Sequence, residues 1–223
     1  MKAMILSAGF GTRLEHYTDK IPKALVPYRN IPMINHQIER LKKIGAEEIV
    51  VNAHHHSNVI LDYFAKNNFG ENITVIIEEE ILGTGGGILN AEDYFRDEEY
   101  FLVMNVDIET DMDLNQMILY HQSKKPFATI AVQKRKTRRY LEFDNEMKLT
   151  GRANENSDVS NEYAFNGIHI ISKRIFNQGY GVKFEDILEI YFNVIKGKKE
   201  FVSGYDCGES TFKDLGKIEN LLS

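Results

Sequence analysis

Short apolar runs and amphipathic segments alternate through the first 132 residues, and this alternation limits the possible folds more than any other feature. Apolar runs of strand length stand at 2–6, 48–52, 73–77, 100–104 and 128–132. Helices are expected at 33–44, after Ser57 as N-cap, from the glycine run near 85 through Phe95, and at 114–123. Strands that alternate with helices in this way form a parallel sheet with helices on both faces.

The second half of the chain follows a different pattern. Strands without long helices are expected at 140–143, 148–151 and 163–171, a polar loop at 151–161, helices at 184–195 and 215–222, and a short β segment at 201–205. At 223 residues the chain can bury one substantial core but is short for two full domains. We therefore predict a single α/β domain: a Rossmann-like three-layer sandwich with a mostly parallel mixed sheet, helices on both faces and a small antiparallel insertion in the second half.

Charge and cysteine content exclude several classes of protein. The formal net charge of -6 leaves no basic excess for a general nucleic-acid binder, and the basic run KRKTRR at 134–139 is interpreted as a solvated turn. The single cysteine, Cys207, excludes an intrachain disulfide and suits a reducing cytoplasm. The opening KAMIL run is too short for a signal peptide, and no run approaches the ~20 apolar residues that span a bilayer. We expect no nucleic-acid or membrane partner, and both a monomer and a homodimer stay open.

Two neighbouring segments near the start combine the features of a phosphate-binding loop. In LSAGFGTRL, Gly9 and Gly11 follow a strand and leave backbone N–H groups open to an anion. Arg13 adds a planar guanidinium, and IPKALVP presents Lys23 on a stretch that its prolines stiffen. A dinucleotide-binding fingerprint would need glycine where Leu14 stands, and a Walker A loop would need G-K-[ST] at the start of a helix. The segments therefore predict polyphosphate binding of another kind.

Four motifs, taken in order, resemble the sugar-1-phosphate nucleotidyltransferase family. The glycine loop with its P-K element matches that family's first signature, and LGTGGGIL (82–89) matches the second. FLVMNVDI (101–108) corresponds to a strand that ends in an aspartate, and TFKDLG (211–216) corresponds to the late W-x-D-x-G element. Within the family, the triple glycine is most similar to bacterial N-acetylmuramic acid 1-phosphate uridylyltransferases and to mannose- or heptose-1-phosphate guanylyltransferases.

The resemblance implies a reaction and a set of catalytic groups. A nucleoside triphosphate and a sugar 1-phosphate would give a nucleotide sugar, for cell-envelope glycans, and pyrophosphate. Asp107 and Asp214 would hold Mg²⁺, with Arg13 and Lys23 as the catalytic cations beside them. The residue chemistry agrees, because Mg²⁺ prefers one or two carboxylates together with phosphate oxygens and water. In-line attack of one anion on another also needs groups that neutralise charge and hold both partners.

The resemblance also divides the chain into a mainly nucleotide-binding half, 1–132, and a mainly sugar-phosphate-binding half, 133–223. It implies a nucleotide site formed by Leu6, Ala8, Gly9, Gly11, Thr12, Arg13, Glu78, Gly83 and Thr84. It implies a sugar-phosphate site formed by Asn105, Asn166, Gly167, Lys183 and Glu185. A carboxylate such as Glu78 can accept from guanine N1–H and N2–H₂ together, which favours guanine slightly over uracil, cytosine and thymine.

The chain departs from the family pattern at several positions. Val106 stands where most relatives place glycine, Phe212 replaces a tryptophan, and Lys217 replaces a threonine. The E-K-P phosphate segment is missing, so Arg152 or Lys183 is expected to hold the sugar phosphate. Two alternatives stay open. One is a catalytically silent nucleotide-sugar-binding regulatory subunit, and the other is a phosphocholine-type cytidylyltransferase, which would need an aromatic cage.

Overall fold

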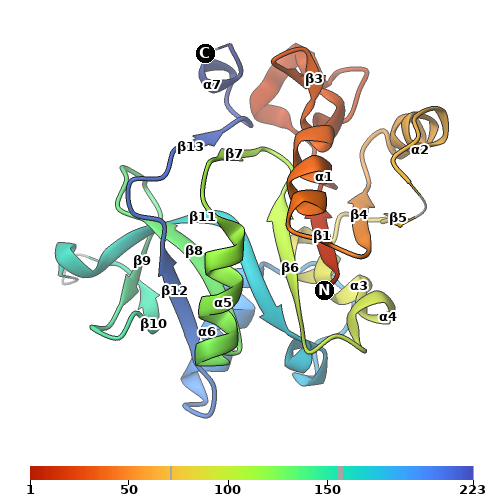
Figure 1. Ribbon diagram of the computed structural model, residues 1–223. Coiled ribbons are helices and arrows are strands. Elements are labelled where there is room, and N and C mark those ends of the chain that lie inside the picture. Colours follow the sequence, from red (N-terminus) through yellow and green to blue (C-terminus); the bar gives the residue numbers. More distant parts are fainter. Residues whose placement is uncertain (71, 155–157, 223) are drawn as a thin grey trace.

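The computed structural model describes residues 1–70, 72–154 and 158–222, so part of the polar loop expected at 151–161 lies outside the described residues. The chain folds around one large mixed sheet (Figure 1). Its strands are β1 (Ala3–Leu6), β4 (Ile49–Ala53), β5 (Ile73–Ile77), β6 (Tyr100–Asn105), β8 (Ala128–Gln133), β9 (Tyr140–Phe143), β10 (Leu149–Arg152), β11 (Glu162–Ser172) and β12 (Val202–Asp206). Two short pairs stand apart from it: β2 (Pro27–Tyr28) with β3 (Ile31–Pro32), and β7 (Ile108–Thr110) with β13 (Phe212–Asp214).

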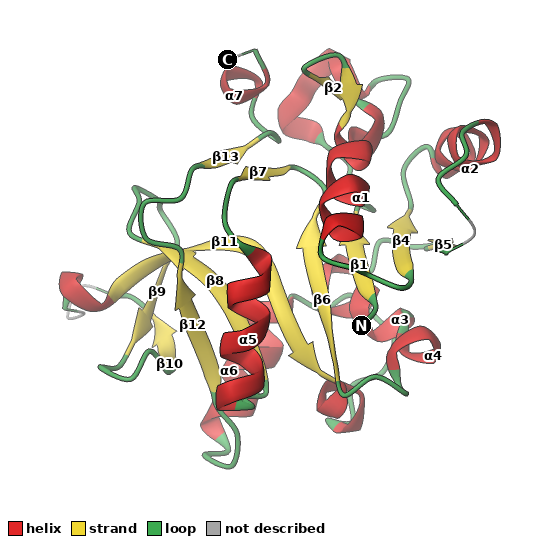
Figure 2. Cartoon of the chain, in the orientation of Figure 1, coloured by secondary structure: helices red, strands yellow, loops and turns green. Residues whose placement is uncertain are grey.

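Helices cover both faces of the sheet (Figure 2). They are α1 (Met33–Lys43), α2 (Ser57–Lys66), α3 (Gly83–Asn90), α4 (Glu92–Phe95), α5 (Leu114–Lys124), α6 (Ile187–Lys196) and α7 (Ile218–Leu221). Short 3-10 helices span Thr12–Thr18, Lys23–Leu25, Val159–Asn161 and Lys173–Asn177. In the part of the chain that is described, no helix combines the length and the apolar character needed to cross a bilayer.

The strand order changes direction between β1 and β6. The parallel part of the sheet runs β6–β1–β4–β5, so the chain first adds strands on one side of β1 and then crosses to the other side. The loops that leave the carboxyl ends of β1 and β6 consequently diverge. In open α/β sheets, ligands bind at this switch in strand order. The fold therefore selects the segments after Leu6 and Asn105 as the walls of the site.

The second half joins the sheet through β11. This long strand runs antiparallel to β6 on one side and to β8 and β9 on the other. The run at 128–132 is a strand, but it does not extend the parallel series as the alternation predicts, because β11 lies between β6 and β8 and only β12 pairs with β8 in parallel. The β9–β10 hairpin curls back toward β12, where Gly204 N–H donates to Met147 O at 2.7 Å. The predicted mixed sheet with an antiparallel insertion is confirmed.

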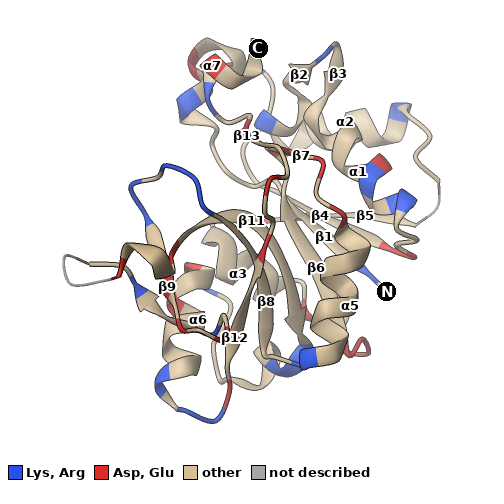
Figure 3. Cartoon of the chain, turned by 60° about the vertical axis from the view of Figure 1, so that its left-hand side comes forward, with Lys and Arg blue, Asp and Glu red and all other residues tan. Residues whose placement is uncertain are grey.

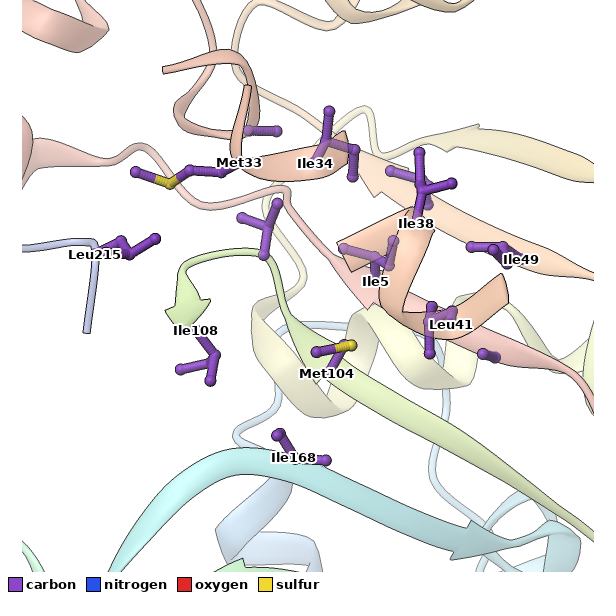
Figure 4. Packing of buried hydrophobic residues seen from close by; sticks show 14 of the residues in the cluster. Ile5, Met33, Ile34, Ile38, Leu41, Ile49, Met104, Ile108, Ile168 and Leu215 are labelled. Atoms are coloured by element: carbon purple, nitrogen blue, oxygen red, sulfur yellow. The ribbon is translucent and has the colours of Figure 1, made fainter. Parts of the chain in front are cut away.

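Alternate residues along the central strands pack into two cores, one on each face of the sheet. Ile5 and Met104 face the core that α1 and α5 cover, whereas their neighbours Met4 and Val103 face α3 and α6. Figure 4 shows the first of these cores, with Ile38 of α1 packed close to Ile5. Full burial of a side chain such as Ile38 stabilises the fold by roughly 1.5–3 kcal/mol. The two cores fix the strands in place, and with them the loops at the carboxyl edge of the sheet.

Several helix boundaries differ from the sequence expectation. Ser57 begins α2 rather than capping it, because His56 is the N-cap and adopts a left-handed conformation with φ 54°. The helix expected to continue through Phe95 is broken at Ala91 into α3 and α4.

The helix expected from 184 begins later, at Ile187, because Asp186 caps it by accepting a hydrogen bond from Leu188 N at 2.8 Å. The closing helix expected at 215–222 is limited to Ile218–Leu221, because residues 215–217 form a turn after β13, in which Lys217 N donates to Asp214 O at 3.2 Å.

Candidate functional site

The glycine loop leaves the carboxyl end of β1, where the strand order switches. Gly11 has φ +70°, and a Cβ there would lie 2.9 Å from Thr18 Cγ2 and 3.1 Å from Lys23 Cβ. A side chain at this position would therefore be strained and would push Lys23 away. A Cβ on Gly9 would meet nothing within 4 Å, so the backbone at Gly9 faces open space. Thr12 and Arg13 are exposed beside it, as a phosphate-binding loop requires.

Two carboxylates from distant parts of the chain meet at the carboxyl end of β6. Asp107 follows β6, and β7 continues from it into antiparallel pairing with β13, which puts Asp214 opposite Ile108. Leu215 N also donates to Asp107 O at 2.8 Å. In Figure 3, acidic colour marks β7 and β13 where they lie side by side above the sheet. The pairing of β7 with β13 is thus the element that brings Asp214 to Asp107.

Two cations from the first half of the chain neutralise this carboxylate pair. Lys23 Nζ lies 2.9 Å from Asp107 Oδ2, and Arg13 Nη1 lies 2.7 Å from Asp214 Oδ2. Arg13 Nη2 also lies 3.7 Å from Asp107 Oδ2, so Arg13 links both acids. Burial of Asp107 raises the pKa of its carboxyl, but attraction to Lys23, the hydrogen bond from Lys23 and attraction to Arg13 together outweigh it and lower that pKa below 3.8. Asp107 is therefore ionised at neutral pH although it is only 5% exposed.

Gly216 allows three of the four charged side chains, those of Asp107, Arg13 and Asp214, to converge. A Cβ at this position would lie 2.5 Å from Asp107 Oδ2, 2.6 Å from Arg13 Nη2 and 2.9 Å from Asp214 Oδ1. The Gly216 N–H in turn donates to Asp214 Oδ1 at 3.0 Å. Even a methyl group would separate the acids from the guanidinium.

A buried amide that sequence reasoning missed holds the backbone on both sides of Asp107. Gln37 of α1 is 0% exposed, and its Nε2 donates to Val106 O at 3.2 Å and to Ile108 O at 2.7 Å. The polar residue stands on the otherwise apolar buried face of α1, and that interruption was the available sequence signal. Gln37 and Leu215 together fix the peptide that carries the buried carboxylate.

Comparison with known proteins decides the family. A family model described as Nucleotidyl transferase matches residues 2–222. The chain belongs to the nucleotidyl transferase family. The resemblance drawn from the four motifs is confirmed.

Curated proteins named as mannose-1-phosphate guanylyltransferases are similar to this chain. The chain is 40% identical over 137 residues to "Mannose-1-phosphate guanyltransferase" of Neurospora crassa, which covers 60% of this chain and 38% of that protein. It is 40% identical over 138 residues to "Mannose-1-phosphate guanylyltransferase 1" of Arabidopsis thaliana, with the same coverage. The matched segment is thus less than two fifths of the length of these relatives.

Solved structures show the same nucleotidyl transferase fold along the whole chain. HddC from Yersinia pseudotuberculosis superposes with a TM-score of 0.80 at 24% identity, covering 98% of this chain and 95% of that one. A putative glucose-1-phosphate thymidylyltransferase from Bacillus anthracis gives a TM-score of 0.82 at 20% identity, covering 100% and 92%. The predicted fold class is confirmed by these likenesses.

The first half of this nucleotidyl transferase contains a buried polar network that joins the ends of three strands. Asn52 at the end of β4 accepts from Ser7 N at 2.8 Å through Oδ1 and donates from Nδ2 to Glu78 Oε1 at 2.6 Å. Glu78 Oε2 accepts from Leu82 N at 3.1 Å. The expectation that the Glu78 carboxylate faces a base is not met, because both its oxygens are engaged and the residue is 3% exposed. Asn52 escaped sequence reasoning because a single polar residue in a strand carries no motif.

The glycine-rich helix α3 packs directly on the chain segment that precedes α6. Gly85 N donates to Glu185 O at 2.8 Å, and a Cβ on Gly86 would lie 2.0 Å from Lys183 O. The Thr84 hydroxyl accepts from Ile187 N at 3.0 Å. Lys183 and Glu185, expected on the sugar side, thus lie against the glycines expected on the nucleotide side and form an ion pair at 3.2 Å. The tertiary structure thus brings Thr84 of the expected nucleotide site beside Lys183 and Glu185 of the expected sugar-phosphate site.

Gly86→Ala should separate α3 from the chain segment that precedes α6. The added methyl group would overlap the Lys183 carbonyl, and backbone cannot move aside as a flexible side chain can, so we expect a loss of about 1–3 kcal/mol of unfolding free energy. Urea unfolding measures the change. Gly181→Ala is the matched control, because a Cβ at Gly181 meets nothing within 4 Å. Equal stability of the two variants would contradict the packing described.

On the sugar side, the structure brings Asn105 and Gly167 together but turns Asn166 away. Gly167 has φ +74°, and a Cβ there would lie 2.7 Å from Asn105 Nδ2. The Asn166 amide is buried, and its Oδ1 accepts from Arg135 Nε at 2.9 Å while its Nδ2 lies 3.7 Å from Cys207 Sγ. The expectation that Asn166 donates to a sugar hydroxyl is therefore wrong. Its amide is already used to hold Arg135.

Arg152, one of the two groups expected to hold the sugar phosphate, lies elsewhere. Its Nη2 pairs with Glu189 Oε1 of α6 at 2.9 Å, and its guanidinium lies 5.1 Å from the centre of the Phe192 ring. These contacts place it in a groove of about 780 Å³ between β10 and α6. Arg152 is thus committed to the outer face of α6.

The donor set at the carboxylate pair suits a magnesium ion. Asp107 and Asp214 supply carboxylate oxygens, and Mg²⁺ takes one or two carboxylates and completes its shell with phosphate oxygens and water. Among residues 1–70, 72–154 and 158–222, no group of three or more His, Cys, Asp and Glu gathers to form a fuller metal site. A metal at this pair would therefore need a substrate phosphate to complete its ligands.

Proposed function

We propose that this chain transfers a nucleotidyl group from a nucleoside triphosphate to a sugar 1-phosphate. The observation that carries the proposal is the convergence of Asp107, Asp214, Lys23 and Arg13 at the carboxyl ends of β1 and β6, beside a glycine loop whose backbone faces open space at Gly9. Family membership supports it, as do the names of the relatives, which are mannose-1-phosphate guanylyltransferases. The roles below follow from the chemistry of these side chains.

In this proposal, the protein's own groups position two anions and neutralise their charge. A phosphate oxygen of the sugar 1-phosphate attacks the α-phosphorus in line, a new P–O bond forms, the bond to the β-phosphate bridging oxygen breaks, and pyrophosphate leaves. The Gly9–Gly11 backbone and Arg13 hold the triphosphate, and Lys23 keeps Asp107 ionised and oriented. Bound Mg²⁺, held by Asp107 and Asp214, supplies further charge neutralisation at the phosphates.

Arg13 is the group that changes partner when the triphosphate binds. Its side chain is 55% exposed, whereas that of Lys23 is 15% exposed, so Arg13 can move and Lys23 cannot. A guanidinium that leaves Asp214 can offer its planar fork to phosphate oxygens. Asp214 is then available as a ligand for Mg²⁺, while Asp107 stays paired with Lys23.

We propose GTP as the nucleotide donor. The support comes from the relatives named guanylyltransferases and from an HddC structure described as complexed with GMP-PN. With Glu78 engaged, recognition of the base would fall to backbone groups around Leu82 and Gly83 that the Glu78–Asn52 network holds in place. These substrates and the single thiol of Cys207 fit work in the cytoplasm.

A pyrophosphate-release assay of GTP, UTP, CTP, ATP and dTTP against a panel of hexose, heptose and amino-sugar 1-phosphates tests this function. We expect release with Mg²⁺, fastest with GTP, and the largest thermal stabilisation also with GTP. Stabilisation by a triphosphate without release from any pair would favour the silent regulatory subunit. Release with CTP and phosphocholine alone would favour the cytidylyltransferase, and either result would refute the proposal.

A further inference from the structure

Arg135 differs from the other basic residues of the loop that follows β8. The loop carries Lys134, Lys136, Arg138 and Arg139, which are all exposed as a solvated turn predicts, and it forms a basic stretch beside the sheet in Figure 3. Arg135 is half-buried, and burial lowers the pKa of its guanidinium although attraction to Asp214 acts in the opposite direction. A cation withdrawn from water in this way carries a cost that a partner must offset.

The contacts of Arg135 fix its guanidinium without neutralising it. Nε donates to Asn166 Oδ1 at 2.9 Å, and Nη2 donates to Phe165 O at 2.8 Å. The guanidinium carbon lies 4.0 Å from the centre of the Phe212 ring. All three partners are neutral, and within the described parts of the chain no ion pair joins Arg135 to a carboxylate within 4 Å. These contacts hold the guanidinium in one orientation, and none of them neutralises its positive charge.

That orientation puts Arg135 beside the carboxylate pair. Phe212 and Asp214 stand two residues apart on β13, so their side chains share a face of that strand. Asn166 immediately precedes Gly167, whose backbone touches Asn105 at the end of β6. The strand order β1–β6–β11–β8 sets Arg135 across the site from Arg13 and Lys23, which come from the loops after β1.

The local charges indicate what this third cation is for. Arg13 and Lys23 balance the two negative charges of Asp107 and Asp214. Arg135 therefore adds a third positive charge beside them, and no carboxylate of the described residues pairs with it directly. Guanidinium groups bind phosphate oxygens strongly and with defined geometry. The acceptor substrate brings such a phosphate. Arg152 and Asn166 are not placed to hold it, and Lys183 is already paired with Glu185 at 3.2 Å.

We propose that Arg135 binds the phosphate of the sugar 1-phosphate, with Asn166 and Phe212 as positioning residues that hold its guanidinium. The inference rests on the proposed function and names the group that captures the acceptor. It explains why Asn166 is buried against Arg135. It also supplies the phosphate ligand that the missing E-K-P segment leaves unassigned.

Steady-state kinetics of Arg135→Gln and Lys136→Gln provide the test. Both changes remove one positive charge from the same loop, but only Arg135 is anchored at the site. Loss of a charged hydrogen bond predicts that KM for the sugar 1-phosphate rises roughly 10- to 100-fold in Arg135→Gln, with KM for the triphosphate unchanged. Lys136→Gln should match the wild type. Equal KM values for the sugar 1-phosphate in the two variants, or a change only in KM for the triphosphate, would overturn the proposal.

A double-mutant cycle tests the positioning role of Asn166. Asn166→Leu should raise the same KM, and adding it to Arg135→Gln should cause little further rise, because both changes act through one guanidinium. Arg135→Lys should restore part of the affinity, since it returns the charge without the fork. Additive effects in the cycle would contradict the positioning role. Thermal melting of each variant identifies any that fail to fold.

Equilibrium binding separates this inference from the proposed reaction. Calorimetric titration of mannose 1-phosphate and of glucose 1-phosphate, in the presence of the non-reactive GMP and Mg²⁺, needs no turnover. We expect binding to the wild type and to Lys136→Gln and a loss of at least tenfold in Arg135→Gln. Equal affinities, or no binding to the wild type, overturn the Arg135 assignment. Absence of pyrophosphate release in spite of this binding pattern would overturn the reaction alone.

Discussion

Asp107→Asn should lower pyrophosphate release by at least 10²- to 10³-fold while leaving the fold intact. The substitution keeps the size of the side chain and an oxygen that can still accept from Lys23 Nζ, now at 2.9 Å from the carboxylate. It removes the buried negative charge that, in our proposal, holds Mg²⁺ against the phosphates, and the loss of one preorganised electrostatic group commonly costs rates of this order. The measurement is the initial rate at saturating triphosphate over a Mg²⁺ titration.

Glu109→Gln is the matched control for this variant. Glu109 lies two residues further on, in β7, and its carboxylate pairs with Arg40 at 3.5 Å and Arg29 at 3.8 Å rather than with the site cations. Its loss should leave turnover within a few-fold of the wild type. Wild-type turnover by Asp107→Asn, or an equal loss in both variants, would remove Asp107 from the mechanism.

Lys23→Met should lower both activity and stability, and the stability loss should depend on pH. At neutral pH the variant leaves Asp107 ionised and buried with only Arg13 at 3.7 Å, so we expect a loss of about 3 kcal/mol, the lower end for a broken buried pair. We also expect kcat/KM to fall roughly 10²-fold or more. Lys20→Met, which removes an exposed charge from the same loop, should change neither quantity appreciably.

The direction of the pH dependence follows from the pKa of Asp107. That pKa is lowered in the folded chain, so ionised Asp107 stabilises the fold above pH 3.8, and this contribution is lost as the pH falls through the lower folded-state pKa. In Lys23→Met, the attraction to Lys23 and the hydrogen bond from it no longer lower this pKa, so ionised Asp107 stabilises the fold less. The stability gap between the two proteins should therefore close as the pH falls below 3.8. A gap in urea-unfolding free energy that is the same at pH 7 and at pH 3 would show that the ion pair is not its source.

Local patterns predicted the parts of the fold that depend on neighbouring residues. Continuous apolar runs located the central strands, and the period-3.6 apolar pattern located α1, because burial is visible within a short stretch of sequence. Boundaries that depend on a distant partner were predicted less well. The helix expected from 184 begins only at Ile187. The residues before it instead form backbone hydrogen bonds with the start of the glycine helix α3, about one hundred residues away in the chain.

The sequence by itself determined which chemical groups are available: the glycine loop, Arg13 and Lys23, and an aspartate in each of two distant motifs. Only the tertiary structure decided their partners. It joined Asp107 to Asp214 through the pairing of β7 with β13, turned Glu78 and Asn166 inward, and left Arg135 held by neutral groups beside the site. The physical reason is that a buried polar side chain must satisfy its hydrogen bonds wherever the packed chain offers a partner. The sequence specifies which hydrogen-bond donors and acceptors the chain contains, but long-range packing selects which of them meet.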